Sequence, residues 1–296
     1  MRVFLTGATG FIGSAIVQEL LSAGHEVLGL ARSDAAEGAL SRVGAQAHRG
    51  ELADTASLAA AARACDGVIH TAFIHDFSAH AAAAETDRQA VTAMLGALVG
   101  SGKPLVATSV TVLLAHARPA TEDMPVPEAS PNPRAKAEAM VLAAAGRGVR
   151  ASVVRLPPSV HGAGDYGFVP MLVRIARSKG VSAYIGEGAN RWPAVHRLDA
   201  ARLYRLALES ALPGARLHAV AEEGLSLRTI AEAIGQGLGV PTRGITADEA
   251  AAHFDWLARF VAIDNPASST LTRSSLGWQP QGAELLADMR DSGYFN

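Results

Sequence analysis

Three glycines near the N-terminus have a spacing that suits phosphate binding. Gly7, Gly10 and Gly13 follow the apolar run 2–5, and an amphipathic helical pattern begins directly after them. A strand that turns straight into a helix presents free backbone amides at the helix N-terminus, where anions bind favourably. Gly7 permits the tight turn, Gly10 lets a pyrophosphate approach the backbone, and Gly13 allows close helix packing. We therefore predict a dinucleotide site that is formed by Gly7, Thr9, Gly10, Phe11, Ile12 and Gly13.

The second expected strand, 26–30, is followed by a basic side chain where an acidic one would bind the ribose 2′-hydroxyl of NAD(H). Arg32 can instead form charge-assisted hydrogen bonds with a ribose 2′-phosphate, and Ser33 is a second donor. A solvated arginine is the alternative interpretation, because Asp34 could still reach the ribose. The sequence therefore predicts NADP(H) as the preferred cofactor, with NAD(H) as the alternative.

The elements that position these residues alternate between short β-rich runs and longer alanine-rich helical stretches. We expect seven strands, at 2–5, 26–30, 46–49, 67–72, 104–109, 151–156 and 216–220. This alternation is typical of βαβ units and predicts an α/β fold with a Rossmann-type, doubly wound parallel sheet. Glu51 and Leu52 follow the third run, where we expect them to meet the adenine.

The pattern changes after residue 220. Helices are expected at 226–238 and 247–261, and the stretch 265–281 is rich in Pro, Ser, Thr and Gly, which indicates a smaller C-terminal substrate-binding lobe. We predict a Rossmann domain over 1–156 plus about 190–220, and a substrate lobe over about 157–189 plus 221–296.

Composition excludes several classes of function. The 296 residues are 49% hydrophobic and 18% charged with a net charge of −2, and no stretch concentrates lysine or arginine. This balance argues against nucleic-acid or anionic-membrane partners and favours a small-molecule substrate. No apolar run is long enough for a membrane helix. Because Cys65 is the only cysteine and the first residues already form a strand pattern, we expect a cytoplasmic location.

Motifs at the ends of the expected strands resemble one enzyme superfamily. They are TGATGFIG at 6–13, HTA at 70–72, TSVTV at 108–112, RLPPSVHG at 155–162, VHRLD at 195–199 and LGWQP at 276–280. With these motifs the chain resembles the short-chain dehydrogenase/reductase superfamily, in the extended or atypical branch related to NAD-dependent epimerases and dehydratases. The carboxyl ends of parallel strands meet at one edge, so the reaction centre is expected there.

The resemblance implies roles for three segments at this edge. The segment of Thr71, Ala72 and Phe73 is expected beside the cofactor, and Ser109 is expected to hydrogen-bond the reacting oxygen. Backbone near the nicotinamide is expected at Pro157, Pro158 and Val160.

The superfamily's catalytic tyrosine and lysine lie four residues apart on one helix, and here only the lysine matches. Lys136 is in register and is expected to hold the nicotinamide ribose, whereas Asn132 occupies the tyrosine position. A carboxamide has no useful proton to transfer, so the ordinary tyrosine mechanism is in doubt. Asp87 stands at the place of the superfamily's asparagine, and we expect it to join a proton relay with Ser109 and Lys136.

Other side chains are candidates for the missing acid or for substrate contacts. His161 and Tyr166 follow the sixth strand and could supply an acid, with plain packing as the alternative. His75 and Asp76 follow the fourth strand and are expected in the substrate pocket. Trp192 could close that pocket or simply pack. We exclude a metal site, because the histidines near residue 75 do not align on one helical face.

These features favour an NADP(H)-dependent oxidoreductase, a reductase of a small carbonyl or imine with an atypical active site. Two alternatives remain: a nucleotide-sugar epimerase or dehydratase, and a non-catalytic NADP(H)-binding sensor or regulator. The alanine-rich helices at 80–100 and 134–146 also permit a homodimer.

Overall fold

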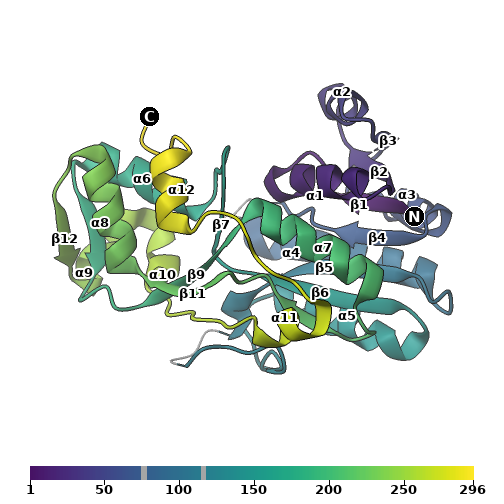
Figure 1. Ribbon diagram of the computed structural model, residues 1–296. Helices are drawn as coiled ribbons and strands as arrows, with labels where there is room; N and C mark the ends of the chain where they lie inside the picture. The colour runs from purple at the N-terminus through teal and green to yellow at the C-terminus, as the bar shows by residue number, and fades with distance from the viewer. Residues whose placement is uncertain (75–78, 115–117) are drawn as a thin grey trace.

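Seven parallel strands form the central sheet of the computed structural model, which describes residues 1–74, 79–114 and 118–296 (Figure 1). The strand order is β10-β6-β5-β4-β1-β2-β3. The strands are β1 (Arg2–Thr6), β2 (Glu26–Ala31), β3 (Gln46–Arg49), β4 (Gly67–His70), β5 (Pro104–Val110), β6 (Arg150–Leu156) and β10 (Arg216–His218). All seven predicted strands are present, and the predicted doubly wound fold is confirmed. Because the order reverses between β1 and β4, the carboxyl ends of these two strands border the expected ligand crevice.

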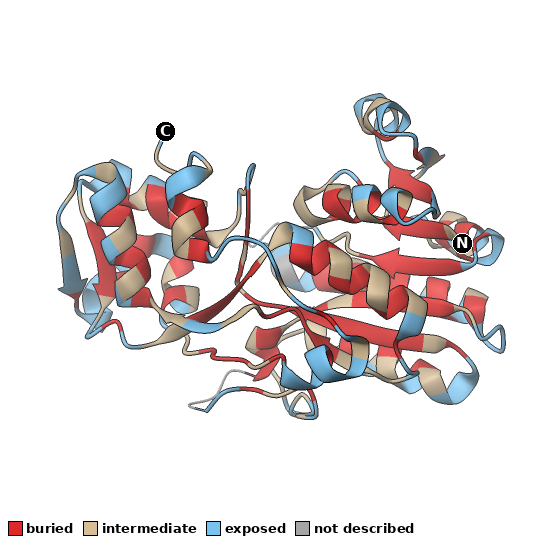
Figure 2. Ribbon diagram, in the orientation of Figure 1, coloured by how far each residue is buried: buried red, intermediate tan, exposed pale blue. Residues whose placement is uncertain are grey.

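Helices cover both faces of the sheet. The helix α1 (Phe11–Ser22) packs against α7 (Arg197–Ser210) on one face, while α3 (Thr55–Ala64), α4 (His80–Leu98) and α5 (Arg134–Ala143) cover the other. The strand β1 shows the period of two that this sandwich requires, since Val3 and Leu5 enter one apolar cluster and Phe4 the other. The short helix α2 (Asp34–Arg42) follows β2. Figure 2 shows this buried centre as a continuous band along the strands.

The smaller lobe has its own apolar core. Its helices are α6 (Phe168–Lys179), α8 (Leu227–Leu238), α9 (Ala247–Phe254), α10 (Ala258–Val261) and α12 (Leu285–Asp291). The strands β8 (Ser182–Ile185) and β12 (Thr242–Ile245) form one small sheet, and β7 (Ser159–His161), β9 (Arg191–His196) and β11 (Glu222–Ser226) form another. The predicted helices at 226–238 and 247–261 are present, but the 3-10 turn η4 (Asp255–Leu257) divides the second one. Asp255 there has a φ of 53°.

The C-terminal segment ties the lobe back to the sheet. After α11 (Thr270–Leu276) the indole of Trp278 donates to the Asp199 carbonyl at 3.0 Å, and the Asp199 carboxylate accepts from the amides of Gln281 and Gly282. A Cβ on Gly282 would lie 2.5 Å from the side chain of His196, so only glycine fits. This clasp fixes the chain at the junction before it enters α12 (Figure 1).

Two further 3-10 turns lie in the described part of the chain. The 3-10 turns η2 (Thr111–Leu114) and η3 (Ala144–Arg147) follow β5 and α5 respectively. Within the described ranges, no helix combines the length and the apolar character that a membrane crossing requires.

Candidate active site

The glycine-rich turn has the geometry that phosphate binding needs. Gly7 adopts a φ of 73°, and a Cβ at Gly13 would lie only 1.9 Å from the Gly7 carbonyl oxygen. The helix α1 starts at Phe11 without a side-chain cap from its N-cap residue, so the amides of Ile12 and Gly13 remain available to an anion. These residues form a cradle that any side chain would fill, which fits the pyrophosphate of a dinucleotide.

A loop from the lobe approaches the same turn. The Tyr166 hydroxyl accepts from the Phe11 amide at 3.4 Å, and the two rings lie edge to face at 5.9 Å. Arg197 stacks over the Phe11 ring at 4.8 Å and donates to Ser14 Oγ and to the Ala163 carbonyl. The structure therefore places Tyr166 beside the glycine-rich turn, at the phosphate end of the site. Arg197, which we did not single out from the sequence, joins it there.

The side chains that follow β2 lie where the adenosine ribose of a dinucleotide is expected. Arg32 is exposed, and Ser33 caps α2 by accepting the Ala36 amide at 3.2 Å, which leaves its own O–H free to donate. Asp34, the alternative ribose ligand, is paired with Arg49 at 2.6 Å. Glu51 is exposed and Leu52 packs against the core on the α3 side of the sheet.

The segment after β4 is held against the glycine-rich turn. The Thr71 hydroxyl donates to the Thr6 carbonyl at 2.8 Å, and the Ala72 amide donates to Thr6 Oγ1 at 3.3 Å. A Cβ on Gly7 would lie 2.7 Å from the Ala72 nitrogen, so the two loops touch. These bonds explain why β4 ends at His70, two residues earlier than predicted. Pro157, Pro158 and Val160 follow β6 and lead into β7 at the same edge of the sheet.

A buried polar chain runs beneath this segment. His70 Nδ1 lies 2.7 Å from Thr6 Oγ1, and His70 Nε2 lies 3.0 Å from the Asp87 carboxylate. Since Thr6 Oγ1 accepts from Ala72, its proton points to His70 Nδ1, which leaves Nε2–H to donate to Asp87. Asp87, on α4, is 5% exposed and is the last member of this series of hydrogen bonds.

Ser109 has a different role from the predicted one. Its hydroxyl donates to the buried carboxylate of Glu138, which pairs with Arg155 at 2.5 Å. The Arg155 guanidinium also donates to the Met124 carbonyl and contacts His218 Nε2 at 3.3 Å. Burial and the neighbouring Arg155 charge lower the pKa of His218 to about 4. Because the Ser109 proton is committed to a carboxylate, this hydroxyl offers lone pairs to a ligand and not a proton.

The structure also corrects the prediction for Lys136. On a helix, residues two apart point in nearly opposite directions, and residues four apart share a face. Arg134 and Glu138 face the sheet, whereas Lys136 is exposed and lies near the exposed Glu85 carboxylate of α4. The Lys136 side chain is therefore directed away from the face of α5 that carries Arg134 and Glu138. The helical spacing of Arg134 and Glu138 was the signal in the sequence that could have identified the inward face.

Arg134 occupies the inward position instead. Its Nη2 donates to the Thr108 carbonyl at 3.2 Å, and its guanidinium lies 4.4 Å from the centre of the Phe73 ring. The Asn132 side chain accepts the Arg134 amide at 3.1 Å, so Asn132 serves as a cap at the start of α5. Burial lowers the pKa of Arg134, and the nearby Asp87 charge opposes that effect.

Two more predicted site residues are structural. His161 is fully buried, and its Nδ1 contacts Asp288 of α12 at 2.8 Å, so it links β7 to α12 inside the lobe. Burial lowers its pKa. Trp192 is 1% exposed and packs on Phe168 in the lobe core, which excludes it from a pocket wall. His75 and Asp76 lie outside the described residues.

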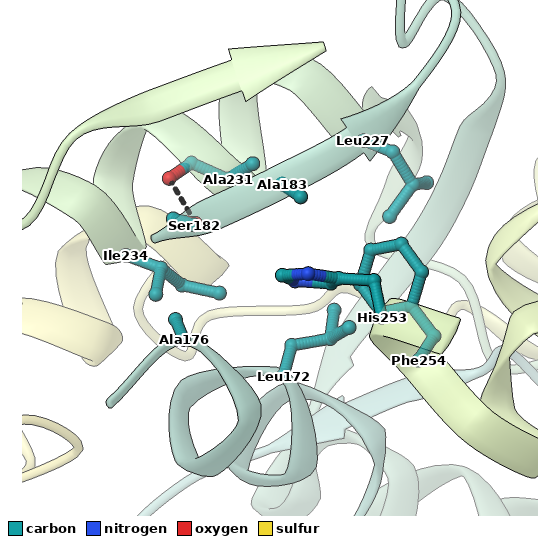
Figure 3. A pocket seen from close by; sticks show the side chains of 9 residues that line it. All are labelled: Leu172, Ala176, Ser182, Ala183, Leu227, Ala231, Ile234, His253 and Phe254. Atoms are coloured by element: carbon teal, nitrogen blue, oxygen red, sulfur yellow. Dashed lines mark hydrogen bonds between the residues drawn. The ribbon is translucent and has the colours of Figure 1, made fainter. Parts of the chain in front are cut away.

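A small cavity inside the lobe lies away from this chemistry. Figure 3 shows it between α6, α8 and β8, with the His253 ring directed into it among apolar side chains. Ser182 at its edge donates to the Ala231 carbonyl. Among the residues that the structure describes, no group of three or more His, Cys, Asp or Glu side chains could hold a metal ion.

Comparisons with known proteins agree with this geometry. The model of the NAD dependent epimerase/dehydratase family matches residues 3–218, and the chain belongs to that family. It is 49% identical to "Uncharacterized protein C2A9.02" of Schizosaccharomyces pombe over the whole of both chains. It is 32% identical over 228 residues to the 2-alkyl-3-oxoalkanoate reductase of Stenotrophomonas maltophilia, covering 73% of this chain and 67% of that protein.

A solved structure shows the same fold at low sequence identity. The dTDP-glucose 4,6-dehydratase DesIV of Streptomyces venezuelae, with NAD and TYD bound, matches with a TM-score of 0.78 and 21% identity over 100% of this chain and 96% of that one. The family and its relatives place the chain among NAD(P)-dependent enzymes of the oxidoreductase and epimerase type, and the predicted superfamily is confirmed.

Proposed function

We propose that the protein is an NADP(H)-dependent reductase of a small carbonyl or imine. The observation that carries the cofactor preference is the end of β2, where Arg32 and Ser33 are free to bind a phosphate while Arg49 neutralises Asp34. Because a guanidinium forms strong charge-assisted bonds with phosphate, this arrangement favours a 2′-phosphate over a 2′-hydroxyl. When bound, the nicotinamide would supply the hydride.

Asn132, which occupies the position of the catalytic tyrosine, favours reduction over epimerisation. Epimerases and dehydratases of nucleotide sugars depend on an acid–base group, yet Asn132 is a helix cap with no proton to give. Two basic side chains of the lobe that could hold a nucleotide diphosphate already have carbonyl partners. Arg177 donates to the carbonyls of Phe295 and Asn296, and Lys179 donates to that of Ala252. The similarity to a 3-oxoalkanoate reductase supports the same choice.

The test is substrate-dependent oxidation of NADPH against panels of ketones, aldehydes, 3-oxo acids and imines. We expect turnover with at least one class and much weaker turnover with NADH. Protection from thermal unfolding by NADPH but not by nucleotide sugars would support the reductase, since only ligands of the native state stabilise it. No turnover on any panel would refute the proposal. Turnover that appears only in Asn132→Tyr would instead support the sensor.

A further inference from the structure

A reductase must hold the oxygen of its substrate while that oxygen gains negative charge. The donor is expected at the carboxyl ends of β4 and β5, beside the glycine-rich turn. Ser109 is there, but its proton goes to Glu138. The acidic hydroxyl that would ordinarily be used is also missing from this edge.

The four tyrosines of the chain are all accounted for elsewhere. Tyr166 contacts the Phe11 amide, and Tyr294 donates to Asp165. Tyr184 belongs to β8 in the lobe, beneath Arg228. Tyr204 is fully buried against Thr108 Oγ1 at 2.6 Å, and burial raises its pKa well above the usual range. None of them occupies the place where a substrate oxygen would be protonated.

Arg134 is a cation at this edge, since its guanidinium donates to the Thr108 carbonyl at the end of β5. We propose that Arg134, and not Lys136, binds the substrate oxygen and stabilises the charge that develops on it. The proposal rests on the reductase function above, and it assigns to one residue the task that a tyrosine and a lysine share elsewhere in the superfamily.

The contacts of Arg134 hold its guanidinium in a fixed orientation with donors to spare. One N–H of Nη2 donates to the Thr108 carbonyl, one residue before Ser109, and the flat face lies on the Phe73 ring. Within the described ranges, the Thr108 carbonyl is the one acceptor that the side chain meets, although a guanidinium carries five N–H donors. A partly buried cation with unused donors is well suited to an oxygen ligand.

The surrounding charges favour a neutral carbonyl over a carboxylate. The negative charge of Asp87 lies near Arg134 and balances its positive charge, while Arg155 balances the negative charge of Glu138. The charges of these four side chains thus nearly cancel before a substrate enters, and a neutral carbonyl preserves that balance. When hydride adds to the carbonyl carbon, the C=O electron pair moves to the oxygen, and the resulting anion gains a full charge interaction with Arg134.

The alkoxide must still be protonated. A guanidinium does not lose its proton at working pH, so Arg134 cannot act as the acid. The oxygen therefore takes a proton from water, which leaves as hydroxide and is neutralised by the buffer. Arg134 contributes through binding, and its contribution requires no change in its own protonation.

The experiment compares Arg134→Met with Lys136→Met, a matched pair on the same helix. For Arg134→Met we expect kcat/KM for the preferred ketone or aldehyde to fall by about 10²–10³-fold, as for loss of one oxyanion donor. Lys136→Met is expected to stay within about twofold, because an exposed lysine contributes little. Arg134→Lys keeps the charge without the planar fork and should be intermediate.

Two readouts separate this role from a structural one. NADPH affinity, measured by fluorescence titration, should be the same in wild type and Arg134→Met, because the arginine holds substrate and not cofactor. Isobutyramide, a carbonyl analogue, should raise the Tm of the wild-type and Lys136→Met NADPH complexes and leave that of Arg134→Met unchanged. Guanidinium ion at low concentration should restore activity to Arg134→Ala, since Phe73 and the Thr108 carbonyl still frame its place.

The outcomes are distinguishable from failure of the reductase function. A wild-type protein without turnover on any carbonyl refutes both proposals. If the wild type turns over a carbonyl, three results overturn the role of Arg134 alone. They are an active Arg134→Met variant, a loss of NADPH affinity in that variant, and a wild-type NADPH complex whose Tm does not respond to isobutyramide. Lost activity in Lys136→Met with an active Arg134→Met would return the role to the lysine.

Discussion

The ion pair between Arg155 and Glu138 offers a direct test of the buried polar network. Arg155 is 0% exposed and Glu138 is 3% exposed, and their closest atoms are 2.5 Å apart. In Arg155→Met the carboxylate stays buried with only the Ser109 hydroxyl to bond it. Leaving one partner of a buried pair uncompensated costs about 3–5 kcal/mol. For a chain of this size the loss corresponds to a Tm decrease on the order of 10 °C.

A second substitution should restore part of the lost stability. Arg155→Met/Glu138→Gln should be more stable than Arg155→Met, because the uncompensated charge is gone. Urea unfolding of the two variants measures the difference in the free energy of unfolding.

A control with similar geometry is available on the surface. Arg49 and Asp34 approach to 2.6 Å, but their side chains are 54% and 97% exposed. Arg49→Met should therefore change stability little. A loss below about 1 kcal/mol in Arg155→Met, or a double variant no more stable than the single one, would refute the reasoning.

Three further predictions follow from single side chains. Arg32→Ala should raise the Kd for NADPH by about 10–100-fold and leave that for NADH unchanged, as measured by calorimetry, because charge-assisted bonds contribute about 1.5–3 kcal/mol; equal loss for both cofactors would exclude a 2′-phosphate role. The pKa of His218 is lowered to about 4 in the folded protein, so as the pH falls the unfolded chain takes up a proton at this residue before the folded protein does. Wild-type stability should therefore fall by about 3 kcal/mol between pH 6.5 and 4. His218→Gln should make this fall smaller. Burial raises the pKa of Asp165 to about 6, so the cost of its charge appears as pH rises from 4 to 6 and above; Asp165→Asn should gain stability relative to wild type over that range, and a constant difference would contradict the assignment.

The sequence predicts the sheet well because its signals are local. Each strand is an apolar run between helices, and Gly7, Gly10 and Gly13 lie within one turn of each other, so periodicity and spacing suffice. The end of β2 is predictable for the same reason, since Arg32 and Ser33 follow the strand directly.

The nicotinamide end is predicted less well because its side chains depend on long-range partners. Ser109 is at the expected place, but its proton goes to Glu138, which a family motif does not reveal. Lys136 was assigned from its spacing in the superfamily's motif. The face of α5 that points inward is decided by packing on the sheet, and this packing brings Arg134 inward. Tyr166 followed the sixth strand as expected, yet its loop reaches back to Phe11.

The path of the chain through its two parts limits how the protein can be divided or recombined. Residues 159–196 build the lobe, 197–218 return to the sheet, the chain then enters the lobe again, and the Asp199 clasp precedes the last lobe helix, α12. The chain cannot be divided at one position into a cofactor-binding domain and a lobe, because neither of them is one continuous segment. New substrate specificities in such a chain must arise by point changes and loop insertions, because exchanging a contiguous fragment with a relative would sever both cores at once.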